Sequence, residues 1–379
     1  MNRTVLTPDQ NAAPVWVYRY EHPARPWVLS VATHAEPGSG KLSLGGFRIV
    51  PAELTAAPDF DVDRMAIGLA LGMEEKVHWS RLLKIGGPLA LRDSSRVAGG
   101  KCVMQPSDDA RIGQPHDAAL LDFALECFRD VEATGGIRLT TGQDLGHGLM
   151  HDGRSQSLDY LSARFLGCVH SDTSKPTAEG NYYVLKGMLD GAGVQLGNAR
   201  VALVGVGNIG EHVLRRLREH GTEILALDIS ARRRDAVRTP GVTTFTQDEK
   251  ARLLAEPVDA VVVNANRQSL DPESCALLAR NERLKVVCGS ENLAMPDPAD
   301  ADRLRAAGKL YCPTELGGMM GYLTAVEEYL ARLEDRPFDI VTMFEAARAL
   351  EEVGRRGARR VLERRFEIGF EAAVRDLHA

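Results

Sequence analysis

The fold of the second half of the chain is set by the stretch Val201-Ala-Leu-Val-Gly205-Val-Gly207-Asn208-Ile209-Gly210. An apolar run precedes the glycines, an amphipathic segment follows them, and the next apolar run ends in Asp228. In this setting the first glycine permits a tight turn, the second lets a phosphate approach the backbone, and the third allows close helix–strand packing. Free N–H groups at the helix start attract phosphate charge. The stretch predicts a Rossmann domain that binds a dinucleotide through Gly205, Gly207, Asn208, Ile209 and Gly210.

Asp228 decides which dinucleotide is expected. A carboxylate at the end of the second strand accepts hydrogen bonds from the adenosine ribose hydroxyls and repels a phosphate on the 2′ oxygen. We therefore expect NAD rather than NADP. The run Arg232-Arg-Arg234 weakens this preference, because arginines in that position either bind a 2′-phosphate or are simply solvated surface charge.

The segments around this stretch alternate in the same way. Apolar runs at 259–263 and 284–288 are separated by helical patterns, which indicates βαβ units and a parallel sheet. In the first half, 27–32, 41–50 and 101–104 read as strands and 117–132 as a helix. We predict an α/β protein with two domains: an N-terminal α/β substrate and catalytic domain (1–177), a C-terminal Rossmann domain (178–336), and C-terminal helices (337–379) that return to the first domain.

Composition excludes several classes of partner. The net charge of −6 gives no reason to expect nucleic acid as a partner. The first thirty residues have no apolar core of the signal-peptide kind, and no window resembles a membrane span, so we expect no membrane partner. The six cysteines are far apart, which favours reduced thiols and a cytoplasmic location. His147 and His151 are four apart but have no third ligand nearby, so ordinary polar contacts are favoured over a metal.

Two motifs in the first half carry chemistry. Ala98-Gly-Gly-Lys101 places a lysine after a glycine pair, where bare backbone lets a small substrate lie close to the amine. Leu139-Thr-Thr-Gly-Gln-Asp144-Leu-Gly146 sets a carboxylate at a strand end. A lysine and a carboxylate that face a substrate make a proton-transfer pair. The alternative is a buried ion pair that joins two strands.

With these motifs in view, most of the chain resembles the glutamate/leucine/phenylalanine/valine dehydrogenase family, and the leucine/phenylalanine branch above all. The resemblance rests on several motifs in the same order: Leu44–Arg48 with Gly45 and Gly46, Gly99–Lys101, Gln143–Gly146, Pro176–Gly180 with Thr177, Gly205–Gly210 with Asp228, and Gly289–Asn292.

The resemblance implies NAD-dependent oxidation at a CH–NH₂ centre, that is, reversible oxidative deamination of an amino acid. It implies that Lys101 polarises the carbonyl or activates water, and that Asp144 exchanges protons with the substrate amino group. Thr177 and Asn292 would contact the cofactor, and Gly45 and Gly46 the substrate. It also implies a homo-oligomer.

The sequence departs from this family where the substrate carboxylate would be held. A second lysine is expected at a fixed spacing before Lys101, and that position is Leu89; the nearest cations are Lys84, Arg92 and Arg96. An asparagine expected near Gly318 is also missing, and Glu315, Met319 and Met320 stand in this region. We therefore expect a non-standard amino acid, an amine, or an imine or 2-oxo compound as substrate, with Leu89 and Gly318 beside it.

Two other functions stay open. A catalytically silent relative that binds a dinucleotide in a regulatory role would have no need of both Lys101 and Asp144. A 2-hydroxyacid dehydrogenase would leave Gly99-Gly100-Lys101 unexplained, and its customary late histidine motif is not recognisable here.

Overall fold

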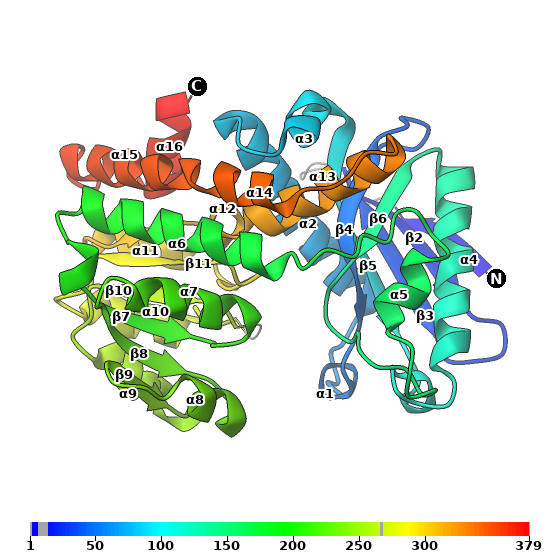
Figure 1. The fold of residues 1–379 in the computed structure, drawn as a ribbon, viewed down its shortest axis with the longest axis horizontal. Helices are drawn as coiled ribbons and strands as arrows, with labels where there is room; N and C mark the ends of the chain where they lie inside the picture. Colours follow the sequence, from blue (N-terminus) through cyan, green and yellow to red (C-terminus); the bar gives the residue numbers. More distant parts are fainter. Residues whose placement is uncertain (1, 7–13, 266–267, 379) are drawn as a thin grey trace. The chain divides into compact units, whose positions relative to one another are not determined.

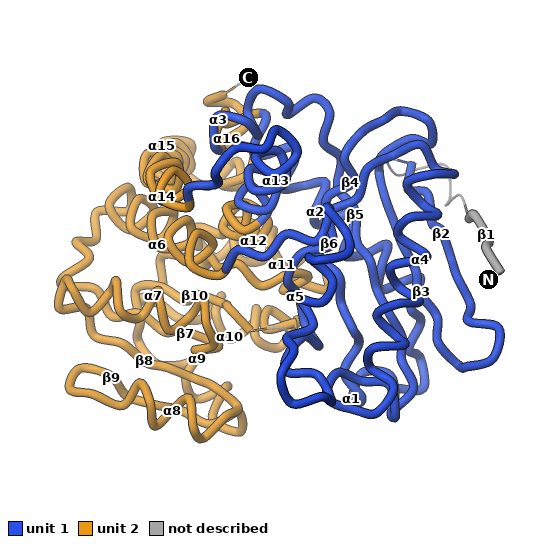
Figure 2. The backbone as a smooth tube through the Cα atoms, turned by 45° about the vertical axis from the view of Figure 1, so that its right-hand side comes forward, with its two compact units in different colours: residues 1–81, 87–173, 322–339 blue, residues 82–86, 174–321, 340–379 orange. Residues whose placement is uncertain are grey.

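The computed structural model describes residues 2–6, 14–265 and 268–378 (Figure 1). The chain divides into two compact units, and each unit is made of segments that are distant in the sequence (Figure 2). Unit 1 consists of residues 1–81, 87–173 and 322–339, and unit 2 of residues 82–86, 174–321 and 340–379.

Unit 1 is built on a mixed sheet of strand order β1-β2-β3-β5-β4-β6. The pairs from β1 to β5 are antiparallel, whereas β4 lies parallel to both β5 and β6. The strands are β1 (Asn2–Leu6), β2 (Trp16–Glu21), β3 (Val28–Thr33), β4 (Leu42–Ile49), β5 (Val97–Gln105) and β6 (Arg138–Gly142). Its helices are α1 (Ala52–Thr55), α2 (Val62–Leu83), α3 (Pro88–Arg92), α4 (Asp117–Gly135) and α5 (Ser157–Ser162), with most of α13 (Met319–Leu333).

The two faces of this sheet are covered by different helices. Successive side chains of a strand point to opposite faces, so residues of β5 divide between them. Cys102 and Met104 pack in the core that contains α4 residues such as Phe128. Val103 packs instead with α2 residues such as Ala66. Lys101 has the same parity as Val103 and therefore points to the face that α2 covers.

Unit 2 contains a fully parallel sheet of order β12-β11-β10-β7-β8-β9, the doubly wound order of a Rossmann fold. The strands are β7 (Arg200–Val204), β8 (Glu223–Leu227), β9 (Val242–Phe245), β10 (Ala260–Val263), β11 (Val286–Gly289) and β12 (Leu310–Tyr311). The helices are α6 (Ser174–Gly191), α7 (Asn208–Arg218), α8 (Ala231–Val237), α9 (Lys250–Ala255), α10 (Pro272–Arg280), α11 (Ala299–Ala306), α12 (Thr314–Gly317), α14 (Ile340–Ala347), α15 (Ala349–Glu363) and α16 (Phe370–His378). The prediction of a Rossmann domain in this half is confirmed.

Helices α6 and α15 lie side by side in unit 2 (Figure 1). A Cβ atom at Gly187 of α6 would lie 2.0 Å from the carbonyl oxygen of Glu351, and one at Gly354 of α15 would lie 2.6 Å from that of Val184. The two backbones therefore approach more closely than side chains would allow.

The domain boundaries differ from the expected ones. Unit 2 begins at Ser174, and residues 340–379 stay with it, whereas we expected residues 337–379 to return to the first domain. The reason is the α6–α15 contact, which holds the last helices against α6. The segment that does rejoin unit 1 is 322–339.

Two buried carboxylates of α13 tie that segment to unit 1. The side chain of Glu327 accepts hydrogen bonds from the N–H groups of Leu89 (3.1 Å) and Ala90 (2.8 Å). Glu328 accepts hydrogen bonds from those of His170 (2.8 Å) and Ser171 (2.9 Å). We assigned the tail to the first domain from its apolar periodicity. That periodicity shows neither the glycines that let α6 and α15 pack closely nor the carboxylates that bind backbone N–H groups.

None of the helices in the described part of the chain is long and apolar enough to cross a membrane. Within residues 2–6, 14–265 and 268–378, no three His, Cys, Asp or Glu side chains gather as a metal site would require. The six cysteines are all buried and unpaired as thiols.

The α6–α15 contact makes a prediction about stability. Gly187→Ala should destabilise the protein by about 1–3 kcal/mol, because the added methyl group forces two backbones apart. In an open helix the same change would stabilise by up to about 1 kcal/mol, so the sign is diagnostic. Thermal unfolding followed by circular dichroism measures it. Gly148→Ala is the control, since a Cβ atom there meets nothing within 4 Å. A melting temperature for Gly187→Ala at or above that of the parent would contradict the packing argument.

Candidate active site

Two glycine pairs lie next to each other on the parallel strands β4 and β5. A Cβ atom at Gly45 would lie 2.0 Å from the carbonyl oxygen of Gly100. A Cβ atom at Gly46 would lie 3.2 Å from Nζ of Lys101 and 3.2 Å from Cβ of Asp144. Any larger residue at Gly46 would therefore crowd the amine and the carboxylate. Both glycines, predicted as substrate contacts, border the predicted catalytic pair.

Lys101 and Asp144 meet in the structure. Nζ of Lys101 forms an ion pair with Oδ2 of Asp144. The guanidinium of Arg48 donates to the other oxygen, with Nη2 at 3.1 Å and Nε at 3.3 Å. The N–H of Leu145 also donates to Oδ1, at 2.7 Å. The predicted pair is thus part of a triad of two cations and one carboxylate, in which Lys101 is buried and the side chains of Arg48 and Asp144 are 12% and 11% exposed.

The turn after β6 is what brings Asp144 to this place. Gly146 has a φ of +85°, which only glycine adopts without strain, and its Cβ position lies 2.1 Å from the carbonyl oxygen of Ile49. The N–H of Ile49 donates to the carbonyl of Leu145 at 3.0 Å. The chain therefore runs tightly past the end of β4, and the glycine of the Asp144-Leu-Gly146 motif is a steric requirement.

Burial and charge set the protonation of this triad. Burial lowers the pKa of Lys101 below its usual value, and the charge of Asp144 only partly offsets this. Burial alone would raise the pKa of Asp144, but Arg48 and Lys101 together lower it well below its usual range. Asp144 therefore remains ionised, whereas Lys101 loses its proton more readily than an exposed lysine.

Arg48 was missed as a functional residue by sequence reasoning. It lies in the quoted stretch Leu44–Arg48, and it follows Gly46 by two positions, so the two residues share one face of β4. That parity was the available signal. What it could not reveal was the partner, because Asp144 is 96 positions away in the chain.

The expected carboxylate clamp looks different in the structure. Leu89 is a buried residue of the short helix α3, and its N–H bonds to Glu327. A buried lysine, Lys76, lies instead on α2. The same helix meets β5 two residues earlier, where the N–H of Gly99 donates to the Glu74 carboxylate at 2.6 Å. Between α2 and β5 the chain folds into α3 and a short 3₁₀ turn (Ser94–Arg96).

The histidines of the loop after Asp144 have separate partners. His147 donates from Nε2 to the carbonyl of Phe47 (2.7 Å), and its Nδ1 lies 3.0 Å from the Ser157 hydroxyl. Nδ1 of His151 lies 3.4 Å from the carbonyl of Gly113. Burial lowers the pKa of His147, so its ring is neutral and holds the loop in place.

In unit 2 the glycine stretch forms the turn that its sequence predicts. Gly205 has a φ of +89°, and its N–H donates to the carbonyl of Leu227 at 2.8 Å. A Cβ atom at Gly210 would lie 2.0 Å from the carbonyl oxygen of Gly205, so α7 packs directly on the end of β7. Helix α7 begins at Asn208, followed by Ile209, with Gly207 as its N-cap. This cradle of bare backbone at a helix N-terminus fits a pyrophosphate.

Asp228 is almost fully buried at the end of β8. Its Oδ2 accepts the N–H of Val206 (3.0 Å) and its Oδ1 that of Ser230 (2.8 Å). The carboxylate is therefore bonded to the glycine turn itself, and its contact with the adenosine ribose stays a prediction.

A polar cluster lies at the ends of β10 and β11. The amide nitrogen of Asn181, on α6, donates to Oδ1 of Asn264 at 2.6 Å, and the hydroxyl of Ser290 donates to the same oxygen at 2.7 Å. Thr177 is buried one turn before Asn181 on the same face of α6. The sequence singled out Thr177 and quoted the stretch Gly289–Asn292 that contains Ser290, but it missed Asn181 and Asn264, because single asparagines carry no periodic signal.

Gly318 and Asn292 are the other predicted contacts in this part of unit 2. A Cβ atom at Gly318 would lie 3.3 Å from Cβ of Ser290. Met319 and Met320 are fully buried. Asn292 is exposed just after β11. The structure brings Gly318 to the ends of these strands, and it leaves the roles of Thr177, Asn292 and Gly318 as predictions.

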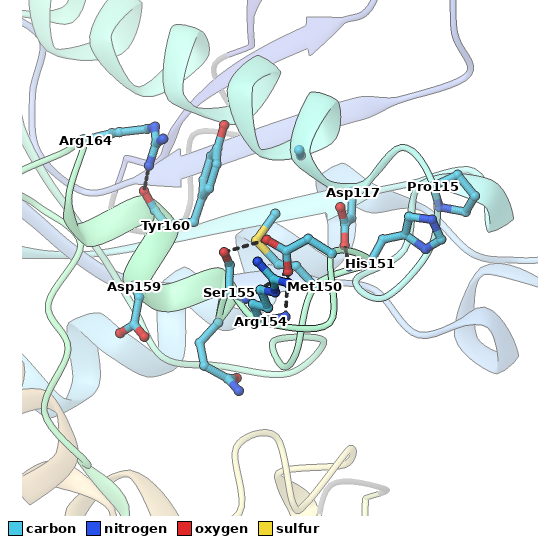
Figure 3. A pocket seen from close by; sticks show the side chains of 12 residues that line it. Pro115, Asp117, Met150, His151, Arg154, Ser155, Asp159, Tyr160 and Arg164 are labelled. Atoms are coloured by element: carbon cyan, nitrogen blue, oxygen red, sulfur yellow. Dashed lines mark hydrogen bonds between the residues drawn. The ribbon is translucent and has the colours of Figure 1, made fainter.

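A pocket of about 600 Å³ in unit 1 is lined by residues of α4, α5 and the segment 150–156 (Figure 3). Its acidic and basic side chains are engaged locally: Asp117 accepts the N–H of His151 at 2.7 Å, and the guanidinium of Arg164 stacks on Tyr160. None of the predicted site residues lines it.

The fold and the two groups of residues define a two-domain α/β protein with a Rossmann dinucleotide-binding unit. The family model described as "D-isomer specific 2-hydroxyacid dehydrogenase, NAD binding domain" matches residues 170–277. The chain is 27% identical over 239 residues to valine dehydrogenase of Streptomyces virginiae, and 28% identical over 247 residues to phenylalanine dehydrogenase of Bacillus thermotolerans. Each match covers 61% of this chain, and 62% and 59% of the respective relative.

Solved structures agree in fold. L-tryptophan dehydrogenase from Nostoc punctiforme superposes with a TM-score of 0.64 at 19% identity, covering 96% of this chain and 93% of that chain. A hetero-hexameric glutamate dehydrogenase from Thermus thermophilus superposes with a TM-score of 0.66 at 16% identity, covering 100% and 87%. The resemblance to the glutamate/leucine/phenylalanine/valine dehydrogenase family is confirmed, as is the NAD-binding Rossmann domain.

The triad predicts how Lys101 titrates. Arg48→Met should raise the pKa of Lys101, because a neighbouring positive charge that disfavours the ammonium form is removed. The ¹³Cε shift of Lys101, followed against pH in lysine-labelled protein, measures this, and Lys101→Met identifies the signal. Arg48→Lys, which keeps the charge, is the control. An unchanged or lower pKa in Arg48→Met would show that burial acts alone.

Proposed function

We propose that the protein is an NAD-dependent oxidoreductase of the amino-acid dehydrogenase type that acts at a CH–NH₂ centre. The observation that carries the proposal is the buried Lys101–Asp144 pair beside the bare backbone of Gly45 and Gly46. It is supported by the matches to valine and phenylalanine dehydrogenases and by the match of an NAD-binding domain.

The residues present suit this chemistry. When bound by unit 2, NAD would supply the hydride acceptor for oxidation of the substrate carbon, and NADH the hydride donor for the reverse reaction. Loss of the hydride and a proton from an amine leaves an imine, and addition of water followed by loss of ammonia gives the 2-oxo compound. Lys101, whose pKa is lowered by burial, activates the water or polarises the carbonyl. Asp144, kept ionised by Arg48 and Lys101, exchanges protons with the substrate nitrogen.

The cofactor would be held by the groups of unit 2. The turn at Gly205, Gly207 and Gly210 and the start of α7 suit the pyrophosphate, and Asp228 suits the adenosine ribose. The polar cluster of Asn181, Asn264 and Ser290, with Thr177, lies at the carboxyl ends of the central strands, where α/β sheets of this order bind ligands. We also infer a cytoplasmic homo-oligomer, as the family resemblance implies.

A 2-hydroxyacid dehydrogenase is the second candidate, because the family model that matches bears that description. The match ends at 277 and begins at 170, so it contains neither Lys101 nor Asp144. A screen of amino acids, amines, 2-hydroxy acids, and 2-oxo acids with ammonia, read as NADH absorbance, separates the candidates. Turnover of 2-hydroxy acids alone would overturn the proposal, and turnover of none would favour a silent relative.

Lys101→Ala and Asp144→Asn test the roles of the pair. Each should reduce turnover by roughly 10²–10⁴-fold, the usual contribution of a general acid or base. The affinity for NAD, measured by calorimetry, should stay nearly unchanged, because neither residue belongs to unit 2. That affinity also reports that the variants fold. A variant with near-parental turnover would mean that the pair is only a structural ion pair.

A substitution of Lys76 tests whether the substrate carries a carboxylate. If it holds a substrate carboxylate, as a buried cation is suited to do, Lys76→Met should raise KM for amino acids by at least about tenfold, since a charged hydrogen bond is lost. Lys84→Met, at an exposed lysine, is the matched control. An unchanged KM would favour a substrate without a free carboxylate, one of the alternatives left open by the missing lysine at Leu89 and the missing asparagine near Gly318.

A further inference from the structure

The three arginines that follow Asp228 are not equivalent in the structure. Arg232 is exposed on α8. Arg234 donates from Nη1 to the carbonyl oxygen of Asp228 at 2.6 Å, so it braces the backbone at the end of β8. Arg233 alone places its guanidinium over the glycine turn.

The position of Arg233 follows from several contacts. Its Nη1 lies 3.9 Å from Oδ2 of Asp228. Its Nη1, Cζ and Nη2 atoms lie 3.4, 3.6 and 3.9 Å from the position of a Cβ atom at Gly207. The hydroxyl of Ser230, which caps α8, accepts the Arg233 N–H at 3.4 Å and fixes the turn from which the side chain extends.

Charge and exposure at this corner differ between the two partners. The side chain of Asp228 is 5% exposed, whereas that of Arg233 is 54% exposed. Each carboxylate oxygen of Asp228 already accepts a backbone N–H, from Val206 and from Ser230. The carboxylate of Asp228, which would repel a 2′-phosphate, is therefore hydrogen-bonded through both oxygens and lies near the guanidinium of Arg233. Of these two charged groups, the guanidinium is the one that solvent reaches.

We propose that Arg233 binds the phosphate on the 2′ oxygen of the adenosine ribose, so that the site accepts NADP as well as NAD. The proposal rests on the proposed dinucleotide-binding function. In Rossmann folds the acidic residue after the second strand meets the ribose hydroxyls, and an arginine beside it accommodates a 2′-phosphate. A guanidinium offers the forked donors that match phosphate oxygens. Asp228 remains to bind the ribose of NAD.

Calorimetric titration of the full chain with NAD and with NADP tests this. The parent should bind NADP within about tenfold of NAD. Arg233→Ala should weaken NADP binding by roughly 10- to 100-fold, the equivalent of a charge-assisted hydrogen bond. It should change NAD binding by much less. Arg232→Ala, one position away on the same helix, is the matched control and should alter neither.

Three results would overturn the inference in different ways. Equal weakening of NAD and NADP in Arg233→Ala would place the arginine at the shared pyrophosphate. Binding of NAD without measurable binding of NADP in the parent would refute the second cofactor while leaving the proposed function intact. Binding of neither dinucleotide would remove the proposed function itself, and the inference with it.

Discussion

The buried amine of Lys101 requires a negatively charged partner, and several features of unit 1 serve to place that partner. The carboxylate of Asp144 supplies the partner, and Arg48 shares it. Breaking such a buried pair is costly, because the remaining charge is left without compensation. Two features hold the loop that carries Asp144, namely the turn at Gly146 and the neutral ring of His147. The glycine pair of β4 leaves space beside Lys101. The chemistry and the local packing therefore depend on the same contacts.

Glycines allow two backbone segments to approach closely at several places in the molecule, and the contact has a different role at each place. In β4 and β5 it leaves room beside an amine. In the turn from Gly205 to Gly210 it brings a helix N-terminus to the end of a strand, where free N–H groups would stabilise the phosphate of the proposed cofactor. Between α6 and α15 it fixes the last helices of the chain to unit 2. Glycine is used in each case because a side chain would occupy the space that the contact requires.

Buried carboxylates perform a related task on the scale of whole segments. Glu327 and Glu328 are neighbours on α13, yet they accept hydrogen bonds from the N–H groups of separate segments of unit 1. One segment is the start of α3, with Leu89, and the other is the loop directly before α6. The order of elements along the chain is therefore not the order of the units, since 322–339 completes the first unit and 340–379 completes the second.

The sequence by itself determined the Rossmann unit, its glycine turn, Asp228, and the motifs of Lys101 and Asp144. These features are local: a turn, a strand end and a helix start are encoded by residues that are adjacent in the chain. Only the tertiary structure decided that Arg48 shares Asp144, that Lys76 is the buried lysine of α2, and that Arg233 rather than its neighbours faces the glycine turn. It also decided where the tail packs. Those outcomes depend on partners far apart in sequence. No periodicity or motif records which distant groups will meet once the sheets have formed.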